Sequence, residues 1–316
     1  MSNHIEVLIV GAGTIAGEYV KVIEALGYHA IVVGRGLTRV KKLQQAYPNT
    51  KVVAGGLSNW LITNKPPKMA IISTPIDHLL DATVLLIKAG VKNILVEKPL
   101  TYSVDEAITL NEQATNAGAN IYVAFNRRNY VSVIKAKQLI KEDGGVSSFR
   151  FDFTEAIFRI DPKNYSSQTT ELWGIANSSH VIDTAFYLGG KPSIIDCRQH
   201  GNAIEWHPSG SIFTGLGTTE EGIPFTYHAD WGCPGKWNIE ILTSKRKLLF
   251  SPMEQLHQQL AGGFKTELVE LDYTNDMNFK PGFYQQTKNL IEGKEAGMQL
   301  KELGEELTIL NKIFNY

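Results

Sequence analysis

Two short segments of the chain combine side chains that can hold and move a proton. In the first, Glu97-Lys98-Pro99, a lysine stands between a glutamate and a proline. Lys98 can donate a hydrogen bond or a proton to a substrate oxygen, and Glu97 can hold the lysine in place. On spacing alone, a surface ion pair is the simpler interpretation of these charges.

The second segment, residues 177–183, reads Asn-Ser-Ser-His-Val-Ile-Asp and leads into a helix expected to stop at Gly189-Gly190. His180 and Asp183 are three residues apart, so they share a face of that helix. A histidine can exchange a proton near neutral pH, which hydride transfer to a carbonyl or from an alcohol requires. The alternative is a buried histidine bonded to Asp183 with no chemical role.

A glycine-rich turn near the start of the chain is expected to position a ligand. Residues 5–10 form an apolar run rich in β-branched side chains, typical of a buried parallel strand. Gly11, Gly13 and Ala16 then fill a Gly-x-Gly-x-x-Ala pattern, which allows a tight turn, a close approach of pyrophosphate and close helix packing. A glycine turn that binds nothing is the alternative. The residues expected to hold a dinucleotide here are Gly11, Ala12, Gly13, Thr14, Ile15 and Ala16.

Strand-like and helix-like segments alternate as far as residue 124, which predicts a parallel sheet with helices on both faces. Ligands bind such sheets at the carboxyl ends of the strands, so the residues that follow each strand matter most. The expected strands are 5–10, 29–33, 51–53, 69–73, 93–96 and 120–124. One helix is expected to begin at residue 14 and another to end at residue 90, and two more are expected near residues 37–46 and 104–117.

The turn after the second strand, Gly34-Arg35-Gly36, bears on the choice of nucleotide. Sites that prefer NAD usually carry Asp or Glu here, and this chain has neither between residues 31 and 39. Arg35 can pair with a 2′-phosphate, assisted by Thr38 and Arg39, which favours NADP. If Arg35 only stacks on the adenine, NAD remains the alternative.

The turn after the fourth strand, Ser73-Thr74-Pro75, has two interpretations. Thr74 or Asp77 can cap the following helix, and proline suits a first helical turn. Alternatively, this turn runs along the cofactor, with His78 among the residues that bind it.

The bulk properties describe an ordinary globular protein. The chain has 316 residues, 43% of them hydrophobic and 20% charged, so two domains are expected, at 1–124 and 125–316. A net charge of −1 and the lack of a long apolar run favour neither nucleic acid nor membrane as a partner. Two separate cysteines, Cys197 and Cys233, indicate no metal site or disulfide framework. With no signal-peptide pattern, a cytoplasmic location is expected.

The second half of the chain is dominated by strand-like segments after a helix over 131–140. Several alternate polar and apolar residues, as in an antiparallel sheet covered on one face. The other face would be polar or meet a partner, so a homodimer or homotetramer is expected. Two closing helices carry apolar stripes, and these helices are candidates to pack back on the first domain. The expected strands are 147–153, 193–199, 211–216, 225–231, 236–243 and 247–250.

The segment 157–173 is too polar for a core and long for a simple connection, so we interpret it as a loop that faces the substrate. Tyr165 is a candidate hydrogen-bond donor, and Trp173 is a candidate wall for a sugar ring. Asn126 and Arg127 are candidates to reach the substrate from the domain junction. A solvated pair of arginines is the alternative for Arg127 and Arg128.

Together these residues resemble the Gfo/Idh/MocA family, the glucose–fructose oxidoreductase and inositol dehydrogenase group, over essentially the whole chain. The resemblance implies an α/β protein. Its N-terminal domain would be a Rossmann dinucleotide-binding domain, and its C-terminal α+β domain would carry an open, mostly antiparallel sheet that often forms oligomer interfaces. It also implies that Lys98 lies near the nicotinamide and the reacting carbon, and that His180 is the family's histidine. The motifs that carry it are residues 11–16, Ser73-Thr74-Pro75, Glu97-Lys98-Pro99-Leu100 and residues 123–128.

One position departs from the family pattern. Many members carry an aspartate four residues before the histidine, where this chain has Ala176. Asn177, the next residue, can orient a substrate but cannot act as a base. Lys98 and His180 would then share the proton work, or another side chain would help.

The resulting expectation is an NAD(P)-dependent oxidoreductase that acts on a sugar, a sugar nucleotide or a related polyol. Asn126, Arg127, Tyr165, Trp173, Asn177 and Asp183 are the expected substrate residues, and no metal is expected. The alternatives are a dinucleotide sensor without catalysis, as in a transcriptional repressor of this fold, and a glycoside hydrolase that uses the nicotinamide transiently.

Overall fold

The computed structural model describes residues 6–316, and over this range the chain divides into two compact units. The first unit runs to Asn129 and also includes Thr274–Glu305. The second unit consists of Tyr130–Tyr273 and Glu306–Tyr316. The first unit thus extends past residue 124, and it includes the first of the two closing helices. Ile5, expected to begin the first strand, lies outside the described residues.

The first unit is built on a sheet with the order β3-β2-β1-β4-β5-β6-β15 within the described range. The pairs from β3 to β6 are parallel, and β15 pairs with β6 in the antiparallel direction. This is the doubly wound order expected when helices cross over between parallel strands. The strands are β1 (Glu6–Val10), β2 (His29–Val33), β3 (Lys51–Val53), β4 (Met69–Ile72), β5 (Asn93–Val96), β6 (Asn120–Val123) and β15 (Met298–Gln299).

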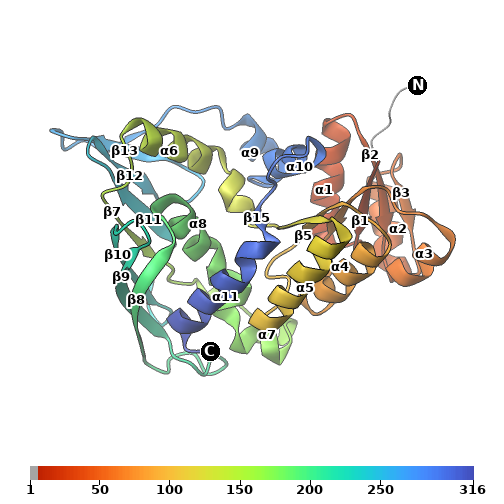
Figure 1. Ribbon diagram of the computed structural model, residues 1–316, viewed down its shortest axis with the longest axis horizontal. Coiled ribbons are helices and arrows are strands. Elements are labelled where there is room, and N and C mark those ends of the chain that lie inside the picture. The colour runs from red at the N-terminus through yellow and green to blue at the C-terminus, as the bar shows by residue number, and fades with distance from the viewer. Residues whose placement is uncertain (1–5) are drawn as a thin grey trace. The chain divides into compact units, whose positions relative to one another are not determined.

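Helices cover both faces of this sheet (Figure 1). On one face, Val7 and Ile9 of β1 pack in a common core with α1 and α10. On the other face, α4 and α5 pack against each other and against β4–β6. The helices of this unit are α1 (Thr14–Ala25), α2 (Leu37–Ala46), α3 (Leu57–Thr63), α4 (Leu79–Lys88), α5 (Val104–Ala117), α9 (Thr274–Asn278) and α10 (Phe283–Ile291).

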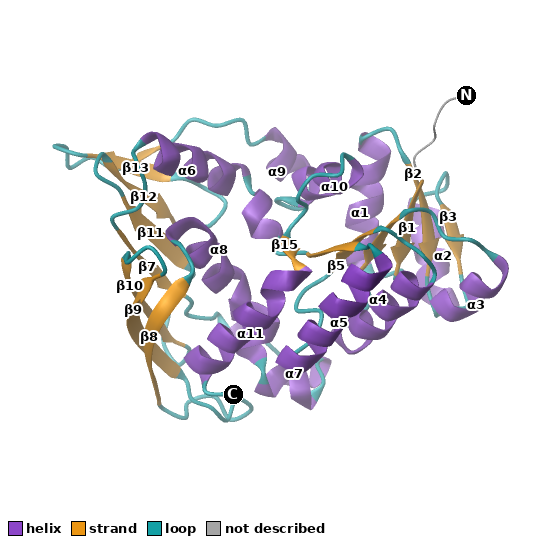
Figure 2. Cartoon of the chain, viewed as in Figure 1, coloured by secondary structure: helices purple, strands orange, loops and turns teal. Residues whose placement is uncertain are grey.

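The second unit holds a sheet with the order β14-β13-β12-β11-β7-β10-β9-β8 in the described part of the chain. Its pairs are antiparallel except β7 with β10, so the expected open, mostly antiparallel sheet is confirmed. Figure 2 shows α6 and α8 beside one face of these strands. The strands are β7 (Ser148–Asp152), β8 (Pro192–His200), β9 (Ile212–Thr219), β10 (Pro224–Asp230), β11 (Asn238–Leu242), β12 (Arg246–Phe250), β13 (His257–Leu260) and β14 (Glu267–Leu268). The helices are α6 (Val131–Glu142), α7 (Ser167–Glu171), α8 (Ser179–Gly189) and α11 (Leu300–Phe314). The first residues of α11 belong to the first unit.

Alternation along β7 explains why one face of this sheet is covered. Phe149 and Phe151 are buried, whereas Arg150 between them is exposed. Phe186 of α8 packs edge-on against both phenylalanine rings, with centroids 6.1 and 5.4 Å away. The segment 157–173, expected to be an irregular loop, contains two 3₁₀ turns and the short helix α7.

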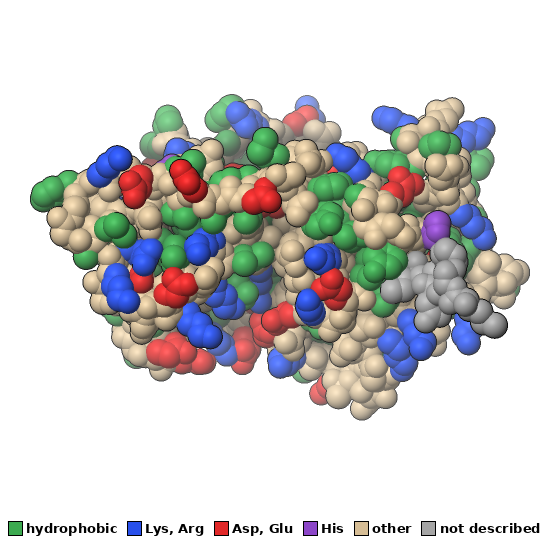
Figure 3. Space-filling view, turned by 90° about the horizontal axis from the view of Figure 1, so that it is seen from above, with side chains coloured by type: hydrophobic (Ala, Val, Ile, Leu, Met, Phe, Trp, Pro, Cys, Tyr) green, Lys and Arg blue, Asp and Glu red, His purple; other side chains and the backbone are tan. Residues whose placement is uncertain are grey.

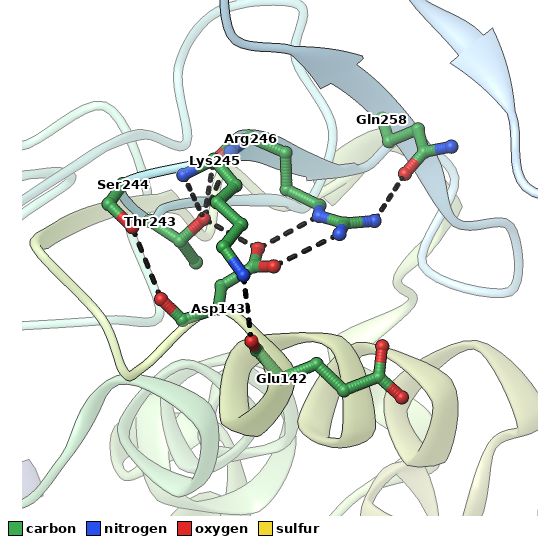
Figure 4. A network of polar contacts seen from close by, with 7 residues as sticks. All are labelled: Glu142, Asp143, Thr243, Ser244, Lys245, Arg246 and Gln258. Atoms are coloured by element: carbon green, nitrogen blue, oxygen red, sulfur yellow. Dashed lines mark hydrogen bonds and ion pairs between the residues drawn. The ribbon is translucent and has the colours of Figure 1, made fainter.

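A buried ion pair ties the end of α6 to the turn between β11 and β12 (Figure 4). The Asp143 carboxylate accepts two hydrogen bonds from Arg246, at 2.8 and 3.0 Å. Thr243 Oγ1 donates a further hydrogen bond to Asp143 at 2.7 Å. Burial alone would raise the pKa of Asp143, but the donors from Arg246 and Thr243 outweigh it and hold that pKa below its usual value.

Candidate active site

The glycine turn after β1 has the geometry that its sequence predicts. Gly11 has φ +115°, and a Cβ there would lie 2.7 Å from the backbone oxygen of Ser73. Its N–H donates to Val33 O at 2.9 Å. By contrast, a Cβ on Gly13 would meet nothing within 4 Å. Gly11 is therefore required by the protein's own backbone, whereas the space beside Gly13 lies open at the N-terminus of α1.

A pocket of about 770 Å³ opens beside this turn, at the carboxyl ends of the strands. Arg35, Thr38 and Arg39 line it, as the sequence predicts for a nucleotide site. Thr74 and His78 line it from the turn after β4. Thr74 Oγ1 is buried and has no hydrogen-bond partner among the residues that the structure describes. The Thr74 hydroxyl is therefore available to form a hydrogen bond with a polar ligand in this pocket.

The loop after β3 also contributes, which the sequence reasoning missed. Gly55, Gly56, Ser58 and Asn59 line the same pocket, and both glycines have positive φ. A glycine pair between a short strand and a helix was the available signal. Gly34 is close-packed, because a Cβ there would lie 2.6 Å from the Ala12 Cβ.

Ala16, Ile15 and Ser73 have structural roles around the glycine turn. Ala16 is fully buried in the core, and Ile15 packs against that core. Ser73 N–H donates to Val10 O at 2.8 Å, which holds the ends of β1 and β4 together.

These features fit a dinucleotide. The open helix N-terminus at Gly13 suits a pyrophosphate, and the unpaired Thr74 hydroxyl and the Arg35 guanidinium suit its polar groups. In the part of the chain that is described, no group of three His, Cys, Asp or Glu side chains is placed to hold a metal ion.

Glu97 follows β5 and is anchored by Tyr19 of α1. Tyr19 Oη donates to Glu97 Oε1 at 2.7 Å, across 78 residues of sequence. Burial raises the pKa of Glu97, although the Tyr19 hydrogen bond and the charges of Lys280 and Lys98 act in the opposite direction. Tyr19 thus holds the Glu97 carboxylate, which also feels the charge of the adjacent Lys98.

The turn before α10 completes the surroundings of Glu97. The Tyr19 ring stacks on Phe283 with centroids 4.5 Å apart, and Lys280 Nζ lies 4.6 Å from the centre of the same ring. Asn126 Nδ2 donates to Pro281 O at 2.9 Å, so Asn126 holds this turn within the first unit. The adjacent Arg127 also belongs to this unit. The sequence offered no signal for Lys280, since only the fold brings it near Glu97.

In the second unit, His180 and Asp183 lie on α8, as expected. Asp183 is 1% exposed, and His180 is partly exposed. Residues Gly174–Ser178, immediately before α8, form a π-helix, a wide turn that is often found at functional sites. Asn177 and the buried Ala176 belong to this turn.

A buried carboxylate that the sequence reasoning missed contacts the π-helix. Glu155 is 6% exposed and lies beyond the end of β7. Asn177 Nδ2 donates to its two oxygens at 3.0 and 2.9 Å, and Ser178 Oγ donates at 2.6 Å. A carboxylate two residues past the end of an expected strand was the only signal that the sequence offered for it.

Tyr165 and Trp173 are in contact, with ring centroids 5.1 Å apart in an edge-on arrangement. Trp173 is 5% exposed and also packs edge-on against Trp206, at 5.7 Å. Tyr165 is about half exposed.

Comparison with known proteins adds independent findings. Residues 5–125 match the family model GFO_IDH_MocA, described as an oxidoreductase family with an NAD-binding Rossmann fold. The scyllo-inositol 2-dehydrogenase (NADP(+)) IolW of Bacillus subtilis is 26% identical over 162 residues. That match covers 50% of this chain and 44% of IolW, so the chain spans less than half of this relative.

Solved structures extend the similarity of fold to the whole chain. An oxidoreductase from Agrobacterium radiobacter in complex with NAD+, L-tartaric acid and magnesium has a TM-score of 0.80 at 13% identity, covering 99% of this chain and 96% of that one. The WlbA dehydrogenase from Bordetella pertussis, in complex with NADH and UDP-GlcNAcA, has a TM-score of 0.77 at 14% identity, covering 100% and 96%. Both units therefore have a fold that is seen in dehydrogenases.

Proposed function

We propose that this chain, whose residues 5–125 match the GFO_IDH_MocA oxidoreductase family model, is an NAD(P)-dependent oxidoreductase. It transfers a hydride between the nicotinamide and a carbinol or carbonyl carbon of a sugar, a sugar nucleotide or a related polyol. The observation that carries this proposal is the open glycine cradle at Gly13 beside the unpaired Thr74 hydroxyl.

The roles proposed for the residues follow from their chemistry. The bound nucleotide supplies the hydride donor or acceptor. The turn Gly11–Ala16 and Thr74 hold its phosphates and orient it. Lys98 polarises or protonates the substrate oxygen, and Glu97, itself held by Tyr19, keeps the lysine in place. His180 gives or takes the proton that accompanies the hydride, while Asn177 and Asp183 orient the substrate.

We propose NADP as the preferred nucleotide. Arg35, Thr38 and Arg39 line the pocket, and the turn after β2 carries no carboxylate to bind a ribose hydroxyl. Ser58 and Asn59 line the same pocket and are further candidates to bind a 2′-phosphate.

The proposed partners are a small-molecule substrate and further copies of this chain. Ile194 and Leu216, 68% and 60% exposed, lie on the uncovered face of the second sheet and support a homodimer or homotetramer formed through that face. The face shown in Figure 3 mixes positive and negative side chains, as expected for a protein that does not bind nucleic acid. Cys197 and Cys233 are free thiols, which supports a reducing compartment such as the cytoplasm.

Turnover of free nucleotide by the wild type and Lys98→Ala tests the proposal. The purified protein is incubated with NADP+ or NAD+ and scyllo-inositol, levoglucosan or UDP-N-acetylglucosamine, and absorbance at the nicotinamide band is followed. We expect net nucleotide reduction with at least one substrate and a loss of about a hundredfold or more in Lys98→Ala. Binding of nucleotide without net turnover would support the sensor or the hydrolase instead. An active Lys98→Ala would remove Lys98 from the mechanism.

A further inference from the structure

We propose that Glu155 is a positioning residue, which holds the Asn177 side chain and the π-helix that leads to His180. This inference rests on the proposed function, because it assigns a role within the same reaction. It is drawn from contacts within the second unit alone.

The contacts of Glu155 are unusually complete for a carboxylate with no assigned role. It is 6% exposed, and it accepts hydrogen bonds from Asn177 at both oxygens and from Ser178 at one. Burying a carboxylate is costly unless several donors satisfy it. Its place in the fold is therefore tied to the last two residues of the π-helix.

These hydrogen bonds decide which way the Asn177 amide points. Because the carboxylate accepts only, the Asn177 NH₂ group must face Glu155 and its carbonyl oxygen must point elsewhere. Asn177 then offers Oδ1 as an acceptor, suited to a substrate hydroxyl. Ala176, the residue before it, has no polar group in its side chain.

Glu155 is itself held in place. Thr154 N–H donates to Asp152 Oδ1 at 2.7 Å, and Thr154 Oγ1 accepts from Asp230 N–H at 3.0 Å. These bonds tie the segment that carries Glu155 to β7 and β10. These two strands are neighbours in the middle of the second sheet, so they fix the position of the carboxylate.

The other end of the π-helix is also fixed. Gly174 N–H donates to Tyr316 Oη at 2.9 Å, and Tyr316 Oη lies 2.6 Å from Nε2 of the buried His207. A Cβ on Gly174 would lie 2.4 Å from the Phe314 ring. The π-helix is thus fixed at its first residue, Gly174, by Tyr316 and Phe314. Glu155 fixes its last two residues, the second of which lies two positions before His180.

Three variants test this role against a matched control. Glu155→Gln replaces one of the two oxygens that accept from Asn177 with an NH₂ donor, and Asn177→Asp places two carboxylates together. The double variant Glu155→Gln/Asn177→Asp restores a donor-to-carboxylate contact with reversed polarity. Glu142→Gln removes an exposed carboxylate at the end of α6 and serves as the control.

With the substrate that the wild type turns over, each single variant should lower kcat about tenfold or more, since small displacements near the reacting groups are costly. The nucleotide KM should stay within about twofold, because the nucleotide residues belong to the first unit. The double variant should have a kcat several-fold higher than either single variant. An unchanged nucleotide KM in the single variants distinguishes this loss from a loss of folding. A wild-type kcat in Glu155→Gln, or a double variant no better than the worse single one, would overturn the inference.

Hydrogen–deuterium exchange separates this inference from the proposed function. Peptides over residues 174–183 should exchange faster in Glu155→Gln than in Glu142→Gln, with the rest of the second unit unchanged. If the wild type turns over no substrate but this acceleration is seen, the proposed reaction fails and the positioning role stands. Unchanged exchange over 174–183 would refute the positioning role whatever the activity.

Discussion

Arg35 is the residue on which the proposed preference for NADP depends. It lines the pocket from the turn after β2, where the chain has no carboxylate to compete for a ribose hydroxyl. In Arg35→Ala we expect NADPH binding to weaken about tenfold or more, since a guanidinium can bind a phosphate through two hydrogen bonds. NADH binding should change by less than about threefold, because NADH lacks that phosphate.

Fluorescence titration with both nucleotides measures the effect, and Lys41→Ala on the exposed surface of α2 is the control. An equal loss for NADPH and NADH would show that Arg35 contacts the adenine. No loss for either would show that Arg35 does not bind the nucleotide.

The turn between β1 and α1 contains two glycines, and replacing each by alanine should affect the stability of the protein differently. Gly11→Ala forces a Cβ to within 2.7 Å of the Ser73 backbone at a positive φ, so we expect the free energy of unfolding to fall by about 2 kcal/mol or more. Gly13→Ala meets nothing within 4 Å, so its stability should stay within about 0.5 kcal/mol of the wild type.

For nucleotide binding, in contrast to stability, Gly13→Ala is expected to be the more harmful substitution. Gly13→Ala should weaken nucleotide binding at least about tenfold, because its methyl group fills the space beside the pyrophosphate. Urea unfolding and nucleotide titration of the same two proteins measure both effects. Wild-type nucleotide affinity in Gly13→Ala would mean that this turn is not the phosphate site.

The ion pair at the end of α6 has a predictable effect on stability. Asp143 is buried and Arg246 nearly so, and Asp143→Ala leaves the guanidinium without its two carboxylate contacts. We expect the free energy of unfolding at pH 7 to fall by about 3 kcal/mol. The exposed pair Lys191–Glu220 is the control, and Glu220→Ala should cost less than about 1 kcal/mol.

The pH dependence follows from the lowered pKa of Asp143. Since its folded-state pKa lies below the unfolded value of about 3.9, its contribution is complete above that pH and is lost as the pH falls through the folded pKa. Urea unfolding at a series of pH values should therefore show the wild type and Asp143→Ala converging below about pH 4. A constant difference down to the most acidic value would contradict this assignment.

For the whole molecule, the uncovered face of the second sheet is the expected contact between copies. Ile194 and Leu216 lie on this face, and Leu216→Glu places a charge there. We expect light scattering on a sizing column to show a dimer or tetramer for the wild type and a monomer for Leu216→Glu. Thr226→Ser on the same face is the mild control. A monomeric wild type would refute the proposed assembly.

The sequence by itself determined the parallel strands of the first unit up to residue 124 and the glycine turn after the first of them. Residues 11–16 and the strand runs around them predicted the sheet, its glycine turn and the place of Arg35, because phosphate cradles and buried parallel strands depend on local residue types. Alternation in β7 likewise predicted the half-covered second sheet. The segment 157–173, expected to be a loop, was described less well, since short helical turns have weak periodicity.

Only the tertiary structure decided which polar side chains meet. Tyr19 belongs to a helical stripe that reads as core, yet its hydroxyl holds Glu97 across 78 residues. Glu155 contacts Asn177 and Ser178 from another element, more than 20 residues away in sequence. No local pattern encodes such pairs, because hydrogen bonds between distant segments arise only when the sheets and helices pack. The local residue types thus identified the proposed nucleotide turn, while packing determined how the candidate catalytic side chains are held.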